Sequence, residues 1–389
     1  MNKSISACLF LCNRSRHRFQ KKVNSGLIRK RLFLSVFCCH TVKFETVTIK
    51  DIARALGLST STVSRALRGS YEISPETKKL VLEYAEKINY RPNPIALSLK
   101  ERKSRSIGVV VSEIANTFFS QAINGIESIA YNRGYHVIIS QSHESYEREK
   151  VTVQHLASRS VDGLLVSLSN ETIDLSHLKQ LHDKGLPIVF FDRITDEINT
   201  HKVTANNVKG AFDATQHLIN KGFTRIAHVT NSPNLSITKE RLQGYQDALK
   251  KNNLPYDDKL VHYCFHGGMI YEEIEGEIKK MFSARQQPDA IVTASDRITT
   301  SCLTALKAAG KKIPDDIAVI GFTNTNIADL FYPPLSAVRQ PAFDMGQTAI
   351  ELLIQIIESK RPVTEFETRI LDTELFTRES SEKPHPPTP

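Results

Sequence analysis

Small hydroxyl side chains and arginines gather in one short stretch of the chain, residues 59–68. At helical spacing, one face of this stretch carries four of them: Ser61, Ser64, Arg65 and Arg68. A hydroxyl group both donates and accepts hydrogen bonds, and a guanidinium group presents a planar fork of donors. Such groups pair with base edges and phosphate oxygens, so the stretch is a candidate surface for nucleic acid.

Two short helices must position this face. Apolar residues recur at i, i+3, i+4 and i+7 from Ile49 to Leu56, which predicts a first helix with Thr48 as its N-cap and Gly57 as its stop. The second helix contains the polar face, and the pair fits a helix-turn-helix whose second helix lies in a DNA major groove. The pattern alone fits a solvated pair of helices equally well.

A third helix is expected to cover the first two, because Ser74 is a good N-cap and Pro75 suits the first helical position. It completes a predicted helix-turn-helix domain over residues 46–93. A short amphipathic piece and a basic run follow, which we interpret as a hinge helix and linker over residues 94–105.

The charge of the 389-residue chain is unevenly distributed. The net charge is +9, but residues 1–44 hold ten basic and no acidic residues, and residues 46–105 hold twelve basic and six acidic ones. Residues 106–389 hold 29 basic and 35 acidic residues. A basic front end before an acidic body is expected when only the front end meets phosphate.

The two ends of the chain lack helical or strand periodicity. We predict that residues 1–45 are a disordered extension and residues 379–389 a disordered tail. Four of the six cysteines lie in the extension, but their spacing does not suit a zinc site, so no metal is expected. No run is long and apolar enough for a membrane span, and the cysteine usage indicates a reducing, cytoplasmic setting.

Strands and helices alternate from Ser106 onward, so residues 106–378 are expected to be α/β. The predicted strands are Ile107–Val111, His136–Ser140, Gly163–Leu168, Pro187–Phe191, Arg225–Thr230, Leu260–Phe265, Ala290–Ala294 and Ala318–Phe322. Continuous β-branched runs of this kind indicate parallel sheets covered on both faces. The eight units divide into two lobes near Asn206, and the last segments return across both lobes. Polar residues follow the carboxyl ends of the strands, where open α/β sheets bind ligands.

These features together resemble the lactose/galactose-repressor family of bacterial transcription regulators. The resemblance runs from about Val47 to Phe376 and rests on strings in the family's order, among them TIKDIARALGLSTSTVSRAL, NYRPNPIALSLK, ERLQGYQDAL, TASDRIT and IPDDIAVIGF. It implies a periplasmic-binding-protein-like body with two lobes, a homodimer or dimer of dimers, and a near-palindromic double-stranded DNA operator. A small molecule, expected to be a sugar or sugar derivative, would bind between the lobes as effector; no cofactor is expected.

The resemblance also implies where the sites lie. On the recognition helix the resemblance gives Thr60, Ser61 and Arg65 as the base-reading positions. In the hinge it gives Leu99 as the wedge that enters the minor groove. The predicted DNA-binding set is Thr60, Ser61, Thr62, Ser64, Arg65, Ala96, Leu99 and Lys100. The predicted effector-binding set is Phe118, Phe119, Asp192, Arg193, Arg241, Asp296 and Asn324. Several of these residues have other possible roles: Arg65 as a phosphate contact, the phenylalanines as core, and Arg193 as a partner of Asp192 or of a neighbouring lobe.

The chain departs from the family's pattern at two cleft positions. Asn206–Asn207 stands where many members have Asp-Asn, and Thr323–Asn324 stands where many have acidic residues.

Two other functions compete with a ligand-responsive repressor of carbohydrate-utilisation genes. A sugar-binding receptor shares the two-lobed body, but it has no use for residues 48–99. An enzyme is not expected, because the chain has neither a dinucleotide-binding glycine fingerprint nor a phosphate loop nor a nucleophile elbow.

Overall fold

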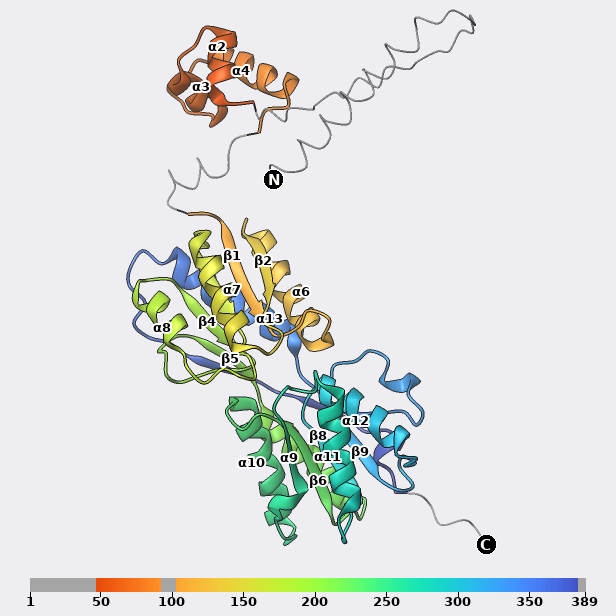
Figure 1. The fold of residues 1–389 in the computed structure, drawn as a ribbon. Coiled ribbons are helices and arrows are strands. Elements are labelled where there is room, and N and C mark those ends of the chain that lie inside the picture. Colours follow the sequence, from red (N-terminus) through yellow and green to blue (C-terminus); the bar gives the residue numbers. More distant parts are fainter. Residues whose placement is uncertain (1–46, 92–102, 384–389) are drawn as a thin grey trace, which may run out of the picture. The chain divides into compact units, whose positions relative to one another are not determined.

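The computed structural model describes residues 47–91 and 103–383, which form two units (Figure 1). The predicted extension, and most of the predicted hinge with Ala96, Leu99 and Lys100, lie outside the described residues.

The first unit is a three-helix domain with α2 Ile49–Leu56, α3 Thr60–Leu67 and α4 Pro75–Lys87. Thr48 and Asp51 form a capping box at the start of α2, where Asp51 Oδ2 accepts from the Thr48 amide at 2.9 Å. Gly57 ends α2 with φ of 66°, a left-handed conformation that glycine adopts without strain. All three helices supply the small core: Ile52, Ala53, Val63, Ala66, Val81 and Ala85. The predicted helix-turn-helix is confirmed.

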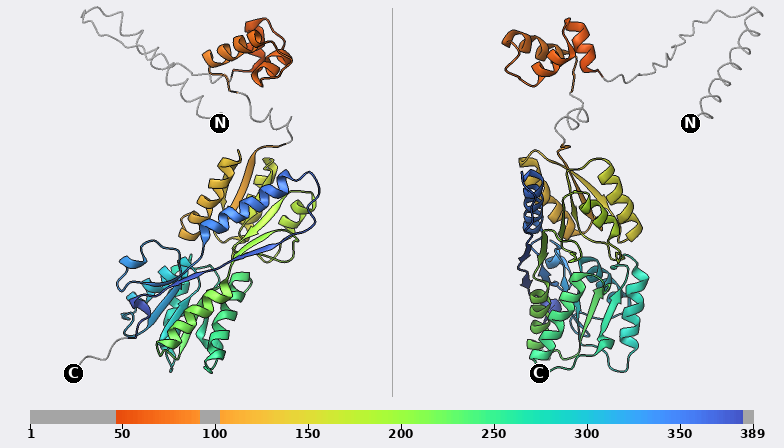
Figure 2. Two further views of the ribbon diagram at one scale, coloured as in Figure 1. Left: turned by 180° about the vertical axis from the view of Figure 1, so that it is seen from behind. Right: turned by 90° about the vertical axis from the view of Figure 1, so that its left-hand side faces the viewer.

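The body contains two six-stranded sheets, each with helices on both faces (Figures 1 and 2). The first sheet has the order β11-β5-β4-β3-β1-β2 and is parallel throughout. Its strands are β1 Ser106–Val111, β2 His136–Gln141, β3 Gly163–Val166, β4 Ile188–Phe191, β5 Lys202–Ala205 and β11 Thr368–Leu371. Its covering helices are α6 Thr117–Asn132, α7 Tyr146–Ser158, α8 Ser176–Asp183 and α13 Ala342–Glu358.

The second sheet has the order β12-β10-β9-β8-β6-β7, and only β12 runs antiparallel to its neighbour. Its strands are β6 Ile226–Asn231, β7 Val261–Cys264, β8 Ala290–Thr293, β9 Ala318–Phe322, β10 Ser336–Arg339 and β12 Glu374–Phe376. Its covering helices are α9 Asn207–Asn220, α10 Ser236–Lys251, α11 Tyr271–Ser283 and α12 Asp296–Ala308. Three short 3-10 turns, Asp258–Leu260, Ala328–Leu330 and Glu379–Ser381, complete the body.

The chain passes between the two lobes three times. It crosses after β5, again between β10 and α13, and finally between β11 and β12, so the C-terminal segments contribute to both sheets (Figure 2). Helix α13 packs against α6 so closely that a side chain at Gly125 would overlap the carbonyl oxygen of Phe343. The predicted mixed α/β fold with parallel sheets is confirmed, and β5, β10, β11 and β12 add to the eight predicted strands to give six in each sheet.

The boundary predicted for the disordered tail at residue 379 is wrong. Ser380 and Ser381 are buried, and Ser381 Oγ lies 2.6 Å from Ser336 Oγ. These contacts join residues 45 positions apart, and no local periodicity announces them. Within the described ranges, no helix is long and apolar enough to cross a membrane.

Candidate DNA interface and effector cleft

Helix α3 presents the predicted base-reading residues. Thr60, Ser61 and Arg65 are exposed, whereas Thr62 and Ser64 are half-buried. Ser59 caps the helix by accepting from the Thr62 amide at 3.0 Å, and its hydroxyl also lies 2.8 Å from Thr62 Oγ1. Thr62 is therefore partly committed to the cap of the helix.

Two of the arginines near α3 have partners within the domain. Arg68 donates from Nη2 to Ser64 Oγ at 2.9 Å, which commits Ser64 as well. Arg65 Nη1 lies 3.1 Å from Glu72 Oε2 in the loop that follows α3. Both side chains of this pair are about half exposed, so DNA can reach them. Sequence reasoning did not single out Glu72, because it lies outside the helical pattern.

Asp192 and Arg193 follow strand β4 in the first lobe. Asp192 is buried at φ of 60°, and burial raises the pKa of its carboxyl group above the ordinary value, against the opposing effect of Arg193 and Arg241. Arg193 turns to Glu144, to which it donates from Nη1 at 2.5 Å and Nη2 at 2.9 Å. This buried bidentate pair ties Arg193 to its own lobe.

Arg241 belongs to α10 of the second lobe and is almost fully buried. It donates from Nε to Asn207 Oδ1 at 2.9 Å and from Nη1 to the carbonyl oxygen of Ala294, and its guanidinium lies 4.1 Å from the centre of the Phe322 ring. Its Nη2 is buried without a hydrogen-bond partner. Burial lowers the pKa of Arg241 to about 10, an effect that the Asp192 and Glu240 carboxylates oppose.

Asp296, the first residue of α12, bridges the lobes. Its Oδ2 accepts from the Phe118 amide of the first lobe at 3.2 Å, and its Oδ1 accepts from the Asn324 amide at 2.9 Å. Burial raises the pKa of Asp296 above its ordinary value, although these hydrogen bonds and one from Thr323 oppose the rise. Phe118 and Phe119 both belong to the core of the first lobe, with their rings edge to face and 5.2 Å apart.

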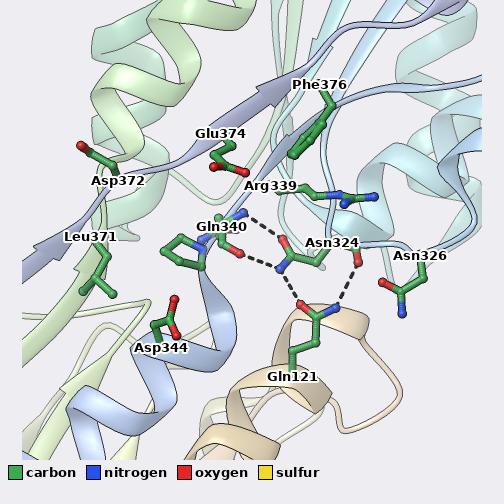
Figure 3. A pocket seen from close by; sticks show the side chains of 11 residues that line it. Gln121, Asn324, Asn326, Arg339, Gln340, Asp344, Leu371, Asp372, Glu374 and Phe376 are labelled. Carbon is green, nitrogen blue, oxygen red and sulfur yellow. Dashed lines mark hydrogen bonds between the residues drawn. The ribbon is translucent and has the colours of Figure 1, made fainter.

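The Asn324 side chain forms a second contact between the lobes, through its hydrogen bonds with Gln121 (Figure 3). Its Nδ2 donates to Gln121 Oε1 and to the carbonyl oxygen of Gln340, both at 2.8 Å, and its Oδ1 accepts from the Gln340 amide at 3.0 Å. The same side chains line a cavity of about 580 Å³ at the chain crossings, together with Arg339, Asp344 and Glu374. Asn324 is thus a link between lobes in this conformation.

Two polar residues at the carboxyl ends of strands have buried side-chain atoms without hydrogen-bond partners. Asn231, at the end of β6, is 1% exposed, and neither its Nδ2 nor its Oδ1 has a hydrogen-bond partner. Ser167 Oγ, just after β3, is also buried without one. Buried polar groups are normally hydrogen-bonded, so these atoms are exceptions whose hydrogen bonds the protein itself does not supply. Both residues belong to the polar ends of strands, which was the only sequence signal for them.

The geometry gathers the predicted cleft residues only in part. Asp192, Arg241 and Asp296 interact electrostatically at the carboxyl ends of the two sheets, because the charges of Asp192 and Asp296 both act on Arg241. Arg193 and Asn324 instead have their hydrogen-bonding groups largely taken by the protein, and the two phenylalanines pack in the core. The arrangement can bind a polar molecule; in the described residues no group of three or more His, Cys, Asp or Glu side chains could hold a metal ion.

Comparison with known proteins agrees with both units. Residues 48–93 match the model described as "Bacterial regulatory proteins, lacI family", and residues 215–381 match "Periplasmic binding protein-like domain". The repressor PurR of Aliivibrio salmonicida is 32% identical over 339 residues, which cover 86% of this chain and 99% of that protein. Catabolite control protein A of Priestia megaterium is 31% identical over 315 residues, which cover 81% and 93%.

A solved structure agrees as well. The transcriptional regulator CelR in complex with cellobiose is 30% identical, with a TM-score of 0.63 and coverage of 86% of this chain and 99% of that one. The described helix-turn-helix and the two-lobed body occur in the same order as the matched domains. The chain therefore belongs to the lacI family of bacterial regulatory proteins and is a ligand-responsive, DNA-binding regulator of transcription.

Proposed function

We propose that this protein is a cytoplasmic, non-enzymatic repressor whose affinity for its operator is set by a carbohydrate or carbohydrate derivative. The effector binds between the lobes, against Asp192, Arg241 and Asp296. On the DNA side, the exposed Thr60, Ser61 and Arg65 read base edges, and Thr62 and Ser64 hold the helix that carries them. Ala96, Leu99 and Lys100 act in the hinge.

The observation that carries this proposal is the buried guanidinium of Arg241. Its unpartnered Nη2 belongs to a guanidinium in the field of three carboxylates, those of Asp192, Glu240 and Asp296, and Asn231 in the same lobe offers a free donor and a free acceptor. A polyhydroxylated ligand satisfies all of these groups, because a hydroxyl donates to a carboxylate and accepts from a guanidinium or an amide. The solved complex of CelR with cellobiose, a protein 30% identical to this chain, supports the carbohydrate class.

Binding between the lobes would act on DNA through lobe closure. The lobes touch through the Asp296–Phe118 contact, through Gln121 with Asn324, and through a hydrogen bond from the Ile194 amide to Ser236 Oγ at 3.1 Å. A ligand that favours one closure must make different contacts in the open and closed states. A coupling of about 1–3 kcal/mol between effector and operator is usual for such devices.

We also propose that the working form is a homodimer or a dimer of dimers, since a near-palindromic operator presents two half-sites. The first lobe offers a surface for a second copy. Strand β2 is an edge strand, and its Ile138 and Ile139 are exposed together with Ile114 and Tyr131 on the same lobe. Sedimentation velocity of the Ile139→Glu variant should give a monomer with weakened operator binding; an unchanged dimer would move the interface elsewhere.

The experiment that tests the effector proposal is a thermal-shift and calorimetric screen of mono- and disaccharides with the full chain. A sugar that binds should lose affinity in Asn231→Ala and in Arg241→Gln. Asn220→Ala, at the exposed end of α9, serves as the matched control and should bind normally. Sugar binding that persists unchanged in both cleft variants would exclude the proposed site. No binding by any carbohydrate would exclude the proposed ligand class.

A further inference from the structure

A second cavity, of about 630 Å³, lies in the second lobe at the edge of the sheet opposite the proposed effector cleft. It is formed where β6 and β7 begin and where α11 ends: Arg225 precedes β6, His262 is the second residue of β7, and Lys280 and Arg285 lie at and beyond the end of α11. Asn231 and Asp296 follow the opposite, carboxyl ends of the strands. The two sites are therefore separate.

The lining of this cavity carries an excess of positive charge. Four basic side chains, Arg225, Lys259, Lys280 and Arg285, face two carboxylates. Arg225 Nη2 lies 3.3 Å from Asp257 Oδ2, and Lys280 Nζ lies 2.5 Å from Glu277 Oε1, so two of the cations are already paired. Among the residues that the structure describes, Lys259 and Arg285 have no ion-pair partner. Two positive charges at the cavity thus remain for an anion.

A buried histidine in the same lining also lacks a partner. His262 is 7% exposed, and its Nδ1 lies 3.0 Å from Glu277 Oε2. Its Nε2 is buried with no hydrogen-bond partner. A buried polar atom left unpaired destabilises the fold, so a bound group that pairs with Nε2 recovers that energy.

From this geometry we infer that the cavity binds a phosphate monoester, with the phosphate group held by Lys259 and Arg285. Because the Glu277 carboxylate accepts from Nδ1 of His262, Nε2 of this ring accepts from a hydroxyl group of the organic part. A phosphate monoester carries a charge close to −2 near neutral pH, which matches the two unpaired cations, and its three terminal oxygens accept from several donors at once. The guanidinium of Arg285 suits two of these oxygens in a bidentate pair. The volume exceeds what a phosphate ion needs, so the site has room for the organic part of the molecule.

The site is tested by calorimetry of the full chain at constant ionic strength, with inorganic phosphate, ribose 5-phosphate and AMP as probes. Ribose and adenosine are the uncharged counterparts. At least one phosphate compound should bind, and its uncharged counterpart should not bind at this site. A preference for ribose 5-phosphate or for AMP over inorganic phosphate is expected and identifies the organic part, whereas equal binding of all three would overturn the monoester and leave a site for the phosphate ion alone.

Substitutions assign the binding to this cavity. Lys259 and Arg285 are exposed, so the double variant Lys259→Gln/Arg285→Gln keeps the fold and should bind at least about tenfold more weakly, as expected for lost charged hydrogen bonds. The control Lys279→Gln/Lys307→Gln removes the same charge from α11 and α12 outside the cavity and should bind within about twofold of the parent, because only screened surface charge is lost. His262→Gln should also weaken binding. No binding by any phosphate compound, or equal losses in the two double variants, would overturn the inference.

Discussion

Arg65 of the recognition helix and Glu72 of the loop after it form an ion pair, with 3.1 Å between Nη1 and Oε2. The pair places a carboxylate beside the arginine that the family resemblance assigns to base reading. Because the side chains are 53% and 46% exposed, the pair is solvated and weak. The DNA contact proposed for Arg65 therefore requires that Glu72 release the guanidinium or share it.

We predict that Glu72→Gln raises operator affinity by about two- to fivefold, the size expected for one exposed ion pair. The substitution frees Arg65 and removes one negative charge beside it on the DNA-binding domain. Fluorescence anisotropy with an operator selected from random DNA measures the change. Glu83→Gln breaks another exposed pair, that with Lys79 on α4, and should leave affinity unchanged. Equal gains in both variants would mean that general charge, not Arg65, is responsible.

Arg65→Ala should cost about 1–3 kcal/mol of operator binding and relax base preference at one position, if its guanidinium pairs with a guanine. The same anisotropy assay, repeated on operators mutated at each position, measures both the loss of affinity and the loss of base preference. A uniform loss on all duplexes, with a smaller salt dependence, would identify a phosphate contact instead.

The buried carboxyl group of Asp192 should make the body's stability depend on pH. Burial raises its pKa in the folded chain, so ionisation of Asp192 destabilises the folded state as pH rises through the normal carboxyl range. Asp192→Asn mimics the neutral form and tolerates the φ of 60°. It should therefore unfold at a higher temperature than the parent near pH 7, and this advantage should disappear below about pH 3.9, the unperturbed Asp pKa.

Thermal unfolding from pH 3.5 to pH 7.5 measures this prediction, with Asp183→Asn at an exposed carboxylate as the control. The control should follow the parent at every pH. A difference between Asp192→Asn and the parent that does not vary with pH would contradict the assignment of the effect to ionisation.

The amide pair of Gln121 and Asn324 should hold the lobes together without a ligand. Gln121 exchanges two hydrogen bonds with Asn324 across the lobe boundary, at 2.8 Å and 3.4 Å, and a typical hydrogen bond contributes about 1 kcal/mol. Gln121→Ala should shift the ligand-free body toward a more open form with a larger radius of gyration in small-angle scattering. Gln347→Ala loses a hydrogen bond within the first lobe only and should scatter like the parent. Identical curves for all three proteins would show that the pair does not hold the lobes.

The close crossing of α6 and α13 should make Gly125 intolerant of substitution. A Cβ atom there would overlap the Phe343 carbonyl, so Gly125→Ala should lower the free energy of unfolding by about 1–3 kcal/mol or more. Gly276 lies in α11 with no atom near its missing side chain, so Gly276→Ala should stabilise the chain by about 0.5–1 kcal/mol through helix propensity. Chemical denaturation compares the two, and equal effects would contradict the packing argument.

The sequence predicted the regular parts of this fold because their signals are local. All eight predicted strands are present, with ends shifted by at most two residues. Strand β5 was missed because it begins with a charged residue, Lys202, whose ammonium group reaches Asp196 at 2.7 Å. The split of the C-terminal stretch into β11 and β12, in different sheets, depends on long-range pairing that no periodicity encodes.

Within the site, residue types were predictable but their partners were not. The resemblance supplied Asp192, Arg241 and Asp296, which the structure places in one electrostatic group. The pairing of Arg193 with Glu144 joins residues 49 positions apart, and that of Gln121 with Asn324 joins residues 203 apart. Contacts of this range are set by how the lobes pack, so the sequence pattern alone does not reveal them.

The coupling between cleft and DNA predicts opposite defects for two substitutions. Asp296 contacts the first lobe through the Phe118 amide, so Asp296→Ala should remove the response to an effector found in the carbohydrate screen. Its effector-free affinity for the operator should stay within a few-fold of the parent, because no DNA contact changes. Leu99→Ala, at the proposed minor-groove wedge, should weaken operator binding by losing its apolar contact between base steps. Its effector affinity in the absence of DNA should be normal.

Both binding constants have to be measured for both variants, by anisotropy for DNA and by calorimetry for the effector. The two predicted defects are independent, since effector and operator communicate only through a change in lobe closure. If the operator affinity of the Asp296→Ala protein still changes normally on addition of the effector, the ligand binds elsewhere than between Asp192, Arg241 and Asp296. A Leu99→Ala protein with reduced effector affinity in the absence of DNA would show that the hinge is coupled to the cleft even off the operator.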